Sequence, residues 1–472
     1  MGNATTASVT GVQVAPAKSA IRDLPIAKVW AFAVGQLGWA LLSGIISNWL
    51  VYFYQPDQET ISQGQTVFVP QGLVVLGIVT VVGGITAFAR FFDAFVDPAV
   101  ASLSDRCDSK SGRRMPFLKF AALPLAVVTV LVFWSPINGT SWVNAAFLFV
   151  TVIGYYIALT FYCTPYNALI AELGHDSKQQ LTISTAISFT WVAGTAIAYV
   201  APVIWGAFVP MMGRITAIRV TFTIMAAVAF VCMLVPPLAI REKDYVNSHP
   251  TSESTIESLK QTFGDGEFRK FVCSDVVYWV AITTFQTGLP FFVTSLLKLP
   301  ETTTTIYFVL MTGVSVLFYL PVNILANKVG KKRLLLVAFV IFTCAFAFAG
   351  ALGSAVLGFI PAMAQGLVLS VVGAIPMAAF GILPQAIVAN IADASSKTTG
   401  QDRQGMFYAA RTFAMKMGQS VAMLLFTGVS TIGMASGAGY RIAAVCAAVL
   451  CGLGGIVFAF YNEKKVLGVL ET

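Results

Sequence analysis

Apolar stretches long enough to cross a lipid bilayer recur along the whole of this chain. A helical span needs about 20 largely apolar residues. Twelve segments approach or exceed that length, near residues 27–54, 69–101, 116–135, 142–171, 181–205, 216–238, 271–297, 303–326, 334–352, 357–391, 405–432 and 438–462. Only 11% of the residues are charged, against roughly a quarter in a soluble domain. The pattern predicts an all-α membrane protein with twelve transmembrane helices.

The longest polar interval divides the twelve segments into two sets of six. The predicted organisation is an N-terminal tail (1–26), a first six-helix bundle (27–238), a central loop (239–270), a second six-helix bundle (271–462) and a C-terminal tail (463–472). The N-terminus has no charged start followed by an apolar core and a small-residue cleavage site, so we expect no removable signal peptide.

The distribution of Lys and Arg predicts the orientation of the chain. Of the 29 basic residues, 22 lie in the two tails and in the loops after segments 2, 4, 6, 8 and 10. Cytoplasmic loops collect positive residues, so we expect a multi-pass protein of the plasma (inner) membrane with both termini in the cytoplasm. This topology explains the net charge of +8, and we expect no nucleic-acid partner.

The two halves contain similar basic turns after their second segments. These are "SDRCDSKSGRRMPF" (104–117) and "ANKVGKKRLL" (326–335), each with a glycine among basic residues. Such internal symmetry is typical of transporters in which two bundles enclose a site near the midplane. The general surplus of positive charge in short cytoplasmic loops would explain the second turn on its own.

Three charged residues lie within the second apolar segment. Arg90, Asp93 and Asp97 are spaced i, i+3 and i+7, so they share one helical face. An ionised group at the bilayer centre costs about 2.5–3.5 kcal/mol and usually has a functional role. Because the two carboxylates are i, i+4 neighbours, they repel unless a positive group lies between them.

Three positive groups are available for that position: Arg90, Lys416 in the eleventh segment, and a cation from solution. An Arg90–Asp93 pair would be structural and would leave Asp97 unexplained. Na+ prefers oxygen ligands, and a proton can occupy the same carboxylates. The corresponding segment of the second half has no acids, which favours a specific task for the pair.

Three motifs resemble one known family. Residues 90–117 read R-x-x-D-A-x-x-D-P-x-x-x-x-x-S-D-R-x-x-S-x-x-G-R-R-x-P-F, and "TFYCTPYNALIAEL" (160–173) and "IADASSKTTGQDRQGMFYAARTFAMKMGQS" (391–420) follow. Together they resemble the glycoside–pentoside–hexuronide:cation symporters, the melibiose-permease-like branch of the major facilitator superfamily. The resemblance spans the chain and implies that superfamily's fold of two six-helix bundles.

The resemblance also implies a function and a set of cation ligands. We expect symport of a small neutral solute, most simply a sugar or glycoside, with Na+ or H+ by alternating access. The implied ligands are Asp93, Asp97, Thr160 and Thr412, with Lys416 as the coupling lysine. We assign Arg90 to coupling as well, and we expect no cofactor beyond the coupling ion and a monomer in the bilayer.

The solute site departs from the family pattern. Where the melibiose permease has sugar-binding acids and an arginine, this chain has Leu37, Cys163 and Ala186, and it has Asn167 in place of an aromatic residue. Neutral thiols and alkyl groups cannot replace charged hydrogen bonds, so galactoside specificity is not implied. The candidate substrate-binding residues are Gln36, Cys163, Tyr166 and Asn167.

The basic turn after the second segment is assigned a separate role. In this superfamily such residues join helices at the cytoplasmic face, and we interpret Asp105, Arg106, Arg113 and Arg114 as a cytoplasmic latch. A general surplus of positive charge would explain Arg113 and Arg114 but not the neighbouring acid.

Two alternatives stay open: a cation-coupled transporter of an amphipathic, lipid-like or other organic solute, and a non-transporting membrane sensor. An enzyme is not expected, because the sequence offers no nucleophile–base pair or phosphate loop and only two histidines, His175 and His249. The seven cysteines lack metal-ligand spacing, so we expect no metal site beyond that of the coupling cation.

Overall fold

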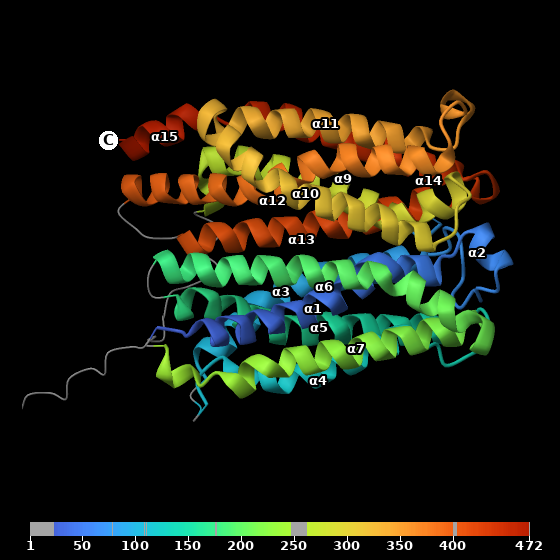
Figure 1. Cartoon of the computed structure of the whole chain (residues 1–472), viewed down its shortest axis with the longest axis horizontal. Coiled ribbons are helices and arrows are strands. Elements are labelled where there is room, and N and C mark those ends of the chain that lie inside the picture. The colour runs from blue at the N-terminus through green and yellow to red at the C-terminus, as the bar shows by residue number, and fades with distance from the viewer. Residues whose placement is uncertain are drawn as a thin grey trace, which may run out of the picture.

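The protein is a bundle of long, roughly parallel helices (Figure 1). The computed structural model describes residues 23–77, 79–107, 109, 111–174, 177–246, 262–399 and 404–471. The long helices of the first half are α1 (Ile26–Tyr54), α3 (Val81–Asp105), α4 (Met115–Val132), α5 (Trp142–Leu173), α6 (Ser177–Met212) and α7 (Arg214–Ala239). Those of the second half are α9 (Gly266–Phe291), α10 (Thr302–Val329), α11 (Lys331–Ala351), α12 (Ala362–Thr399), α13 (Gln404–Val429) and α14 (Ala438–Ala459).

Short helices connect or follow these elements. They are α2 (Gln58–Ser62), the 3-10 turns η1 (Glu242–Asp244), η3 (Ala355–Leu357) and η4 (Met434–Ser436), the π-helical turn η2 (Phe292–Leu296) and α15 (Glu463–Glu471). The beginning of α1 and the C-terminal helix α15 lie at one end of the bundle, which we call the terminal end (Figure 1). Helix α2 lies at the other, which we call the opposite end.

The expected all-helical membrane fold is confirmed. Ten of the described helices are long and apolar enough to cross a membrane. The two long helices outside that set are α3 and α13, and these carry the charges expected inside the membrane, namely Arg90, Asp93, Asp97 and Lys416, together with Arg411. The exceptions to the hydropathy pattern therefore coincide with the candidate site.

Some predicted boundaries differ from the helix ends in the structure. Helix α3 begins at Val81 rather than near residue 69, because Gly72 and Gly77 adopt positive φ angles of 83° and 71° in the preceding loop. Helix α9 begins at Gly266, within the predicted central loop, and the predicted C-terminal tail contains α15. Most of the predicted N-terminal tail, residues 247–261 and both histidines lie outside the described residues.

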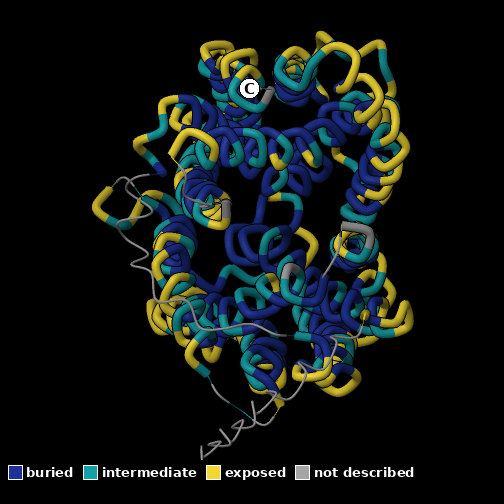
Figure 2. The backbone as a smooth tube through the Cα atoms, turned by 90° about the vertical axis from the view of Figure 1, so that its left-hand side faces the viewer, coloured by how far each residue is buried: buried dark blue, intermediate teal, exposed yellow. Residues whose placement is uncertain are grey.

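The two halves lie side by side along the bundle. In Figure 1 the blue-to-green helices of the first half form the lower part and the yellow-to-red helices of the second half form the upper part. Seen from the terminal end, exposed residues lie on the outer rim and buried residues toward the centre (Figure 2). A protein that presents apolar side chains such as Leu317 and Val150 on its outer surface is suited to a hydrocarbon solvent.

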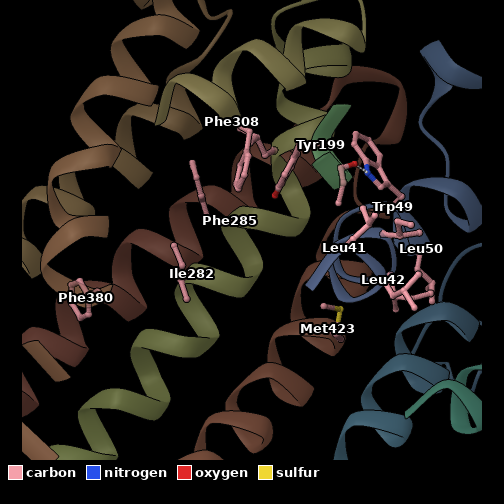
Figure 3. Close-up of a cluster of buried hydrophobic side chains, with 14 of the residues drawn as sticks. Leu41, Leu42, Trp49, Leu50, Tyr199, Ile282, Phe285, Phe308, Phe380 and Met423 are labelled. Atoms are coloured by element: carbon pink, nitrogen blue, oxygen red, sulfur yellow. Dashed lines mark hydrogen bonds between the residues drawn. The ribbon is translucent and has the colours of Figure 1, made fainter. Parts of the chain in front are cut away.

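Aromatic packing joins the halves toward the opposite end. The rings of Tyr199 in α6 and Phe308 in α10 are stacked with centroids 3.3 Å apart (Figure 3). The Trp49 indole in α1 donates a hydrogen bond to the carbonyl oxygen of Ala198 at 2.8 Å. This contact satisfies the polar atom of a large buried ring, as membrane interiors require.

A buried ion pair joins the halves at the opposite end. Glu301, at the start of α10, pairs with Arg214 of α7 at 2.6 Å. The same carboxylate accepts hydrogen bonds from the Trp205 indole at 2.6 Å and the Tyr52 hydroxyl at 3.1 Å. One acid of the second half is thus held by three helices of the first half.

Further hydrogen bonds lie around that ion pair. The Asp57 carboxylate, before α2, accepts hydrogen bonds from Thr294 at 2.7 Å and from Ser295, both in η2. The Gln55 amide donates to the carbonyl oxygen of Thr427 and to the hydroxyl of Ser430, each at 2.9 Å. The opposite end is therefore closed by a network between the halves.

We predict that adding one methyl group at Gly194 destabilises the protein. A Cβ there would lie 2.6 Å from the backbone oxygen of Leu37 in α1, and backbone cannot move aside at low cost. Gly194→Ala should cost about 1–3 kcal/mol and lower the apparent melting temperature of the purified protein. On the same helix, Gly206 has its nearest atom 3.9 Å away, so Gly206→Ala should be neutral or stabilising. Equal shifts for the two variants would contradict this account of the α1–α6 contact.

Candidate cation-binding site

The predicted acidic pair lies in the middle of α3, where the two halves meet. Asp93 is buried, with 1% of its surface exposed, and Asp97 follows one turn later on the same face. Helix α3 packs against α13 of the second half, and the Ser420 hydroxyl in α13 donates to the carbonyl oxygen of Ala87 at 2.7 Å. The carboxylates are thus presented to the facing helix of the other bundle.

Lys416 of α13 occupies the position between the two carboxylates. Its Nζ lies 2.7 Å from Asp93 Oδ2 and 2.5 Å from Asp97 Oδ2. Of the three positive groups that the sequence offered, the lysine is the one that forms the ion pairs. The Arg90 guanidinium also interacts electrostatically with both acids, so the two carboxylates are balanced by two cationic side chains, of which only Lys416 forms ion pairs with them among the described residues.

Hydroxyl groups of α5 complete the oxygen cluster. The Thr160 hydroxyl bonds to Asp93 Oδ1 at 2.6 Å and to Asp97 Oδ1 at 3.1 Å. The Thr164 hydroxyl lies 3.3 Å from Asp97 Oδ1. We did not select Thr164 from the sequence, although its i+4 spacing from Thr160 placed it on the same helical face.

Thr412 lies apart from these oxygens. Its side chain is exposed, and its hydroxyl donates to the carbonyl oxygen of Tyr408 in its own helix at 2.9 Å. This is the bond that a helical threonine forms by default. The structure therefore does not bring Thr412 into the cluster, and a ligand role for it stays a prediction.

Arg90 faces an aromatic ring. Its guanidinium carbon lies 4.9 Å from the centroid of the Tyr156 ring in α5, a cation–π distance. None of the ion pairs found among the described residues joins Arg90 to Asp93 or Asp97. The alternative of a structural Arg90–Asp93 ion pair is therefore not seen among the described residues, and the coupling role of Arg90 stays a prediction.

The candidate substrate residues occupy different environments. Tyr166 is fully buried, its ring is stacked on Phe32 with centroids 4.3 Å apart, and its hydroxyl donates to the Phe32 carbonyl oxygen at 2.7 Å. Gln36 is buried, and its Oε1 has no hydrogen-bond partner in the described part of the chain. Cys163 is half-buried and lies between Thr160 and Thr164 along α5, whereas Asn167 is exposed. Tyr166 thus contributes to packing between α5 and α1, and Gln36 has an acceptor available.

Three of the four predicted latch residues, Asp105, Arg113 and Arg114, belong to an ion-pair cluster at the terminal end of the first half. Arg114 Nη2 lies 2.5 Å from Asp105 and 2.9 Å from Glu172 of α5. Arg113 lies 3.2 Å from the same Glu172 oxygen. Arg106 is exposed and has no ion pair among the described residues. These contacts join α3, α4 and α5 within one half, and a conformational role for the four residues stays a prediction.

Glu242 is a structural residue that sequence reasoning missed. It follows α7, is buried, and accepts hydrogen bonds from the backbone amides of Arg113 and Arg114 at 2.8 Å and of Met115 at 3.0 Å. It thus caps the positive end of α4. Gly112 beside it has φ = 112° and leaves no room for a Cβ, so the turn requires glycine.

The second half repeats this arrangement. Glu463, after α14, accepts hydrogen bonds from the amides of Lys331 at 2.9 Å and Lys332 at 3.2 Å at the start of α11. Gly330 precedes them with φ = 94°. The sequence did contain a signal for both glutamates, since a Glu-Lys pair follows the last segment of each half. In the structure each of these pairs lies beside the basic turn of its own half.

A search against known families matches most of the chain. The family model described as MFS/sugar transport protein matches residues 31–462. This match confirms the expected resemblance and the expectation of a membrane transporter rather than an enzyme.

Curated relatives share low but extended similarity. "Inner membrane symporter YicJ" of Escherichia coli (strain K12) is 26% identical over 226 residues, 47% of this chain and 47% of that protein. "Uncharacterized symporter YjmB" of Bacillus subtilis (strain 168) is 23% identical over 359 residues, 74% of this chain and 75% of that protein. The "Isoprimeverose transporter" of Lactiplantibacillus pentosus is 23% identical over 175 residues, 37% of this chain and 33% of that protein. The match therefore spans less than half the length of two of these three relatives.

Solved structures share the fold. The nucleoside transporter NupG aligns with a TM-score of 0.61 at 14% identity, covering 93% of this chain and 100% of that one. A D-xylose-proton symporter aligns with a TM-score of 0.63 at 14% identity, covering 93% and 98%. At such low identity the likeness concerns the arrangement of helices alone.

We predict that neutralising Glu242 destabilises the first half. An amide cannot accept from three backbone N–H groups as a carboxylate does, so Glu242→Gln should cost about 1–3 kcal/mol. Thermal unfolding of the purified protein measures the change. Asp244, in the same turn, is exposed, and Asp244→Asn is the matched control with an expected change near zero. A loss as large for Asp244→Asn as for Glu242→Gln would show that the cap is not the cause.

Proposed function

Because this chain belongs to the MFS/sugar transport protein family, we propose that it is a cation-coupled symporter of a small neutral solute, a sugar or glycoside, that works by alternating access. Curated relatives include proteins named as symporters and an isoprimeverose transporter. A multi-pass membrane protein with two helical halves is the architecture that this mechanism uses.

One observation carries the proposal: the Lys416 ammonium lies between Asp93 and Asp97, with Thr160 bonded to both acids. The ammonium marks a position where a monovalent cation is held by carboxylate oxygens. Na+ or H+ arriving there competes with the lysine for the same acids. The residues proposed to bind the cation are Asp93, Asp97 and Thr160, with Thr164 as an addition from the structure.

This competition supplies a physical route to coupling. The acids belong to the first half and the lysine to the second, so a cation that displaces Lys416 removes an ionic tie between the halves. The freed ammonium is a strong hydrogen-bond donor for solute hydroxyls. Cation and solute then favour each other's binding by the same factor, and each changes the free-energy difference between conformations.

The distribution of contacts between the halves supports a particular state. Among the described residues, the side-chain hydrogen bonds that join the halves lie at Lys416 or nearer the opposite end. We assign the terminal end to the cytoplasm because Lys and Arg are in surplus there. With that orientation, the proposed state is closed on the outer side of the membrane and faces inward. Both termini are then cytoplasmic.

We predict that cation binding depends on Asp97 and Thr160. In thermal-shift measurements on the purified protein, NaCl compared with KCl at equal ionic strength should stabilise the wild type. Asp97→Asn should abolish that shift, and Thr160→Val should raise the NaCl concentration for half-maximal shift by about tenfold, the effect of one lost oxygen ligand. If protons are the coupling ion, the melting temperature should depend on pH between 5 and 8 instead of on Na+, and the same two variants should weaken that pH dependence.

A matched control and one discriminating variant accompany this test. The Thr223 hydroxyl bonds to its own helix in α7, so Thr223→Val should leave the shift unchanged. Thr412→Val tests the remaining predicted ligand. A weaker cation-induced shift would show that Thr412 binds the cation in another conformation, and an unchanged shift would show that it is a surface hydroxyl without that role. A full cation response in Asp97→Asn would refute the proposed site, and a sugar panel run in parallel tests the solute class.

We also predict that Glu301 holds the opposite end closed. Glu301→Gln weakens the pairing with buried Arg214, and loss of a buried charge partner costs about 3–5 kcal/mol. Spin labels at the exposed positions Asn138 and Val356, in a background without native cysteines, should report longer distances between the halves. Glu59→Gln, at the same end, is the control. An unchanged distance distribution in Glu301→Gln would contradict a gating role for this pair.

A further inference from the structure

A buried ion pair within the second half has no part in the proposed cation site. Arg411 of α13 donates two hydrogen bonds to Asp275 of α9, from Nε at 2.8 Å and from Nη2 at 3.1 Å. The two residues are buried, with 8% and 4% of their surface exposed. Each carboxylate oxygen accepts from the guanidinium, so the pair is neutral and does not itself attract a cation.

The surroundings of this pair hold α13 closely against α9. The guanidinium carbon of Arg411 lies 5.8 Å from the ring centroid of Phe271, one turn before Asp275 in α9. Gly418 follows Arg411 by seven residues and therefore shares its helical face. A Cβ at Gly418 would lie 2.8 Å from the backbone oxygen of Val276 in α9. Along this face the two helices are in close contact.

Lys416 lies on a different face of α13. Five residues separate it from Arg411, which is about 140° around the helix. Ser420, one turn after Lys416, donates to the carbonyl oxygen of Ala87 in α3 at 2.7 Å. Helix α13 thus has one face on α9 of its own half and another face on α3 of the first half.

The orientation of α13 decides whether the ammonium reaches the two acids. Side chains lie about 5–6 Å from the helix axis, so turning α13 by about 30° would move them by about 3 Å. The ammonium lies 2.7 Å from Asp93 and 2.5 Å from Asp97, and a displacement of that size would break both contacts. The two-point contact of Arg411 with Asp275 depends on angle as well as distance, so it resists such a turn.

We propose that Arg411 and Asp275 are positioning residues for Lys416: they fix α13 on α9 so that the ammonium is held between the acids of α3. The inference rests on the proposed cation site. When a cation displaces Lys416, the ionic tie between α13 and α3 is lost, whereas the tie between α13 and α9 remains. Helix α13 then moves with its own half when the two halves separate.

The test is a sodium titration followed by thermal unfolding of the purified full-length protein, with KCl keeping the ionic strength constant. Asp275→Leu with Arg411→Met removes both charges at once, a replacement that buried ion pairs commonly tolerate. A less firmly held lysine competes less for the acids. The Na+ concentration for half-maximal shift should therefore fall about tenfold, the effect of one weakened charge-assisted hydrogen bond.

Two further measurements cover a proton-coupled protein and a second pair of substitutions. If the wild type responds to protons instead of Na+, the midpoint of its pH dependence should rise by about one unit in the same double variant, because the acids then bind a proton more readily. Asp275→Asn with Arg411→Gln removes the charges while keeping polar groups at both positions, and it should change the ion midpoint in the same direction.

Two comparisons show whether the pair acts through the lysine. Lys416→Gln removes the competing ammonium, and in that background Asp275→Leu with Arg411→Met should change the ion midpoint no further. The hydroxyl of Ser274, the neighbour of Asp275, donates to the carbonyl oxygen of Gly454 at 2.7 Å and so joins α9 to α14 instead of to α13. Ser274→Ala should lower the melting temperature in KCl and leave the ion midpoint unchanged.

The outcomes separate this inference from the proposed function. An unchanged ion midpoint in the charge-free double variants, with the response still lost in Asp97→Asn, would overturn the inference and leave the cation site intact. A further change in the Lys416→Gln background, or an equal change in Ser274→Ala, would overturn it as well. A wild type that responds to neither ion would refute the proposed function, and the inference with it.

Discussion

The ion pairs of Lys416 with Asp93 and Asp97 are the interaction on which the arrangement of the two halves depends. Charges taken out of water cost several kcal/mol each unless they are paired and hydrogen-bonded, and here the partners come from different halves. Helix α3 must therefore face α13 across the midplane. Because these two helices carry the paired charges, α3 and α13 are the long helices that fall outside the set apolar enough to cross a membrane. One electrostatic constraint thus accounts both for the exceptions in hydropathy and for the position of the site.

The remaining polar contacts divide into those within a half and those between halves. Glu242 and Glu463 each cap a helix of their own half, so these contacts hold segments of one half together. Between halves, Glu301 and Asp57 hold the opposite end together. In the proposed alternating-access mechanism the two halves rock against each other. Such a motion changes the contacts between the halves, at the opposite end and at Lys416, and leaves those within each half in place.

The sequence predicted most of the cation cluster but not all of its members. Helical spacing placed Asp93 and Asp97 on one face, and their repulsion suggested Lys416 as one of three possible counter-charges. The family resemblance added Thr160, and the structure brings all four together. The same resemblance named Thr412, whose hydroxyl bonds to its own helix instead. Glu242 escaped notice because its partners are more than 100 residues away. The beginning of α3 was placed too early because apolar loop residues extend the hydropathy pattern.

The sequence by itself determined that this chain crosses the membrane many times, that it consists of two similar halves, and which charged residues lie within the bilayer. Those properties follow from local hydropathy and from the helical repeat, which need no knowledge of distant segments. Only the tertiary structure decided that Lys416 rather than Arg90 lies between the acids and that the end opposite the termini is closed. These outcomes depend on how helices far apart in the sequence pack, and packing is set by the shapes and partners of side chains in three dimensions.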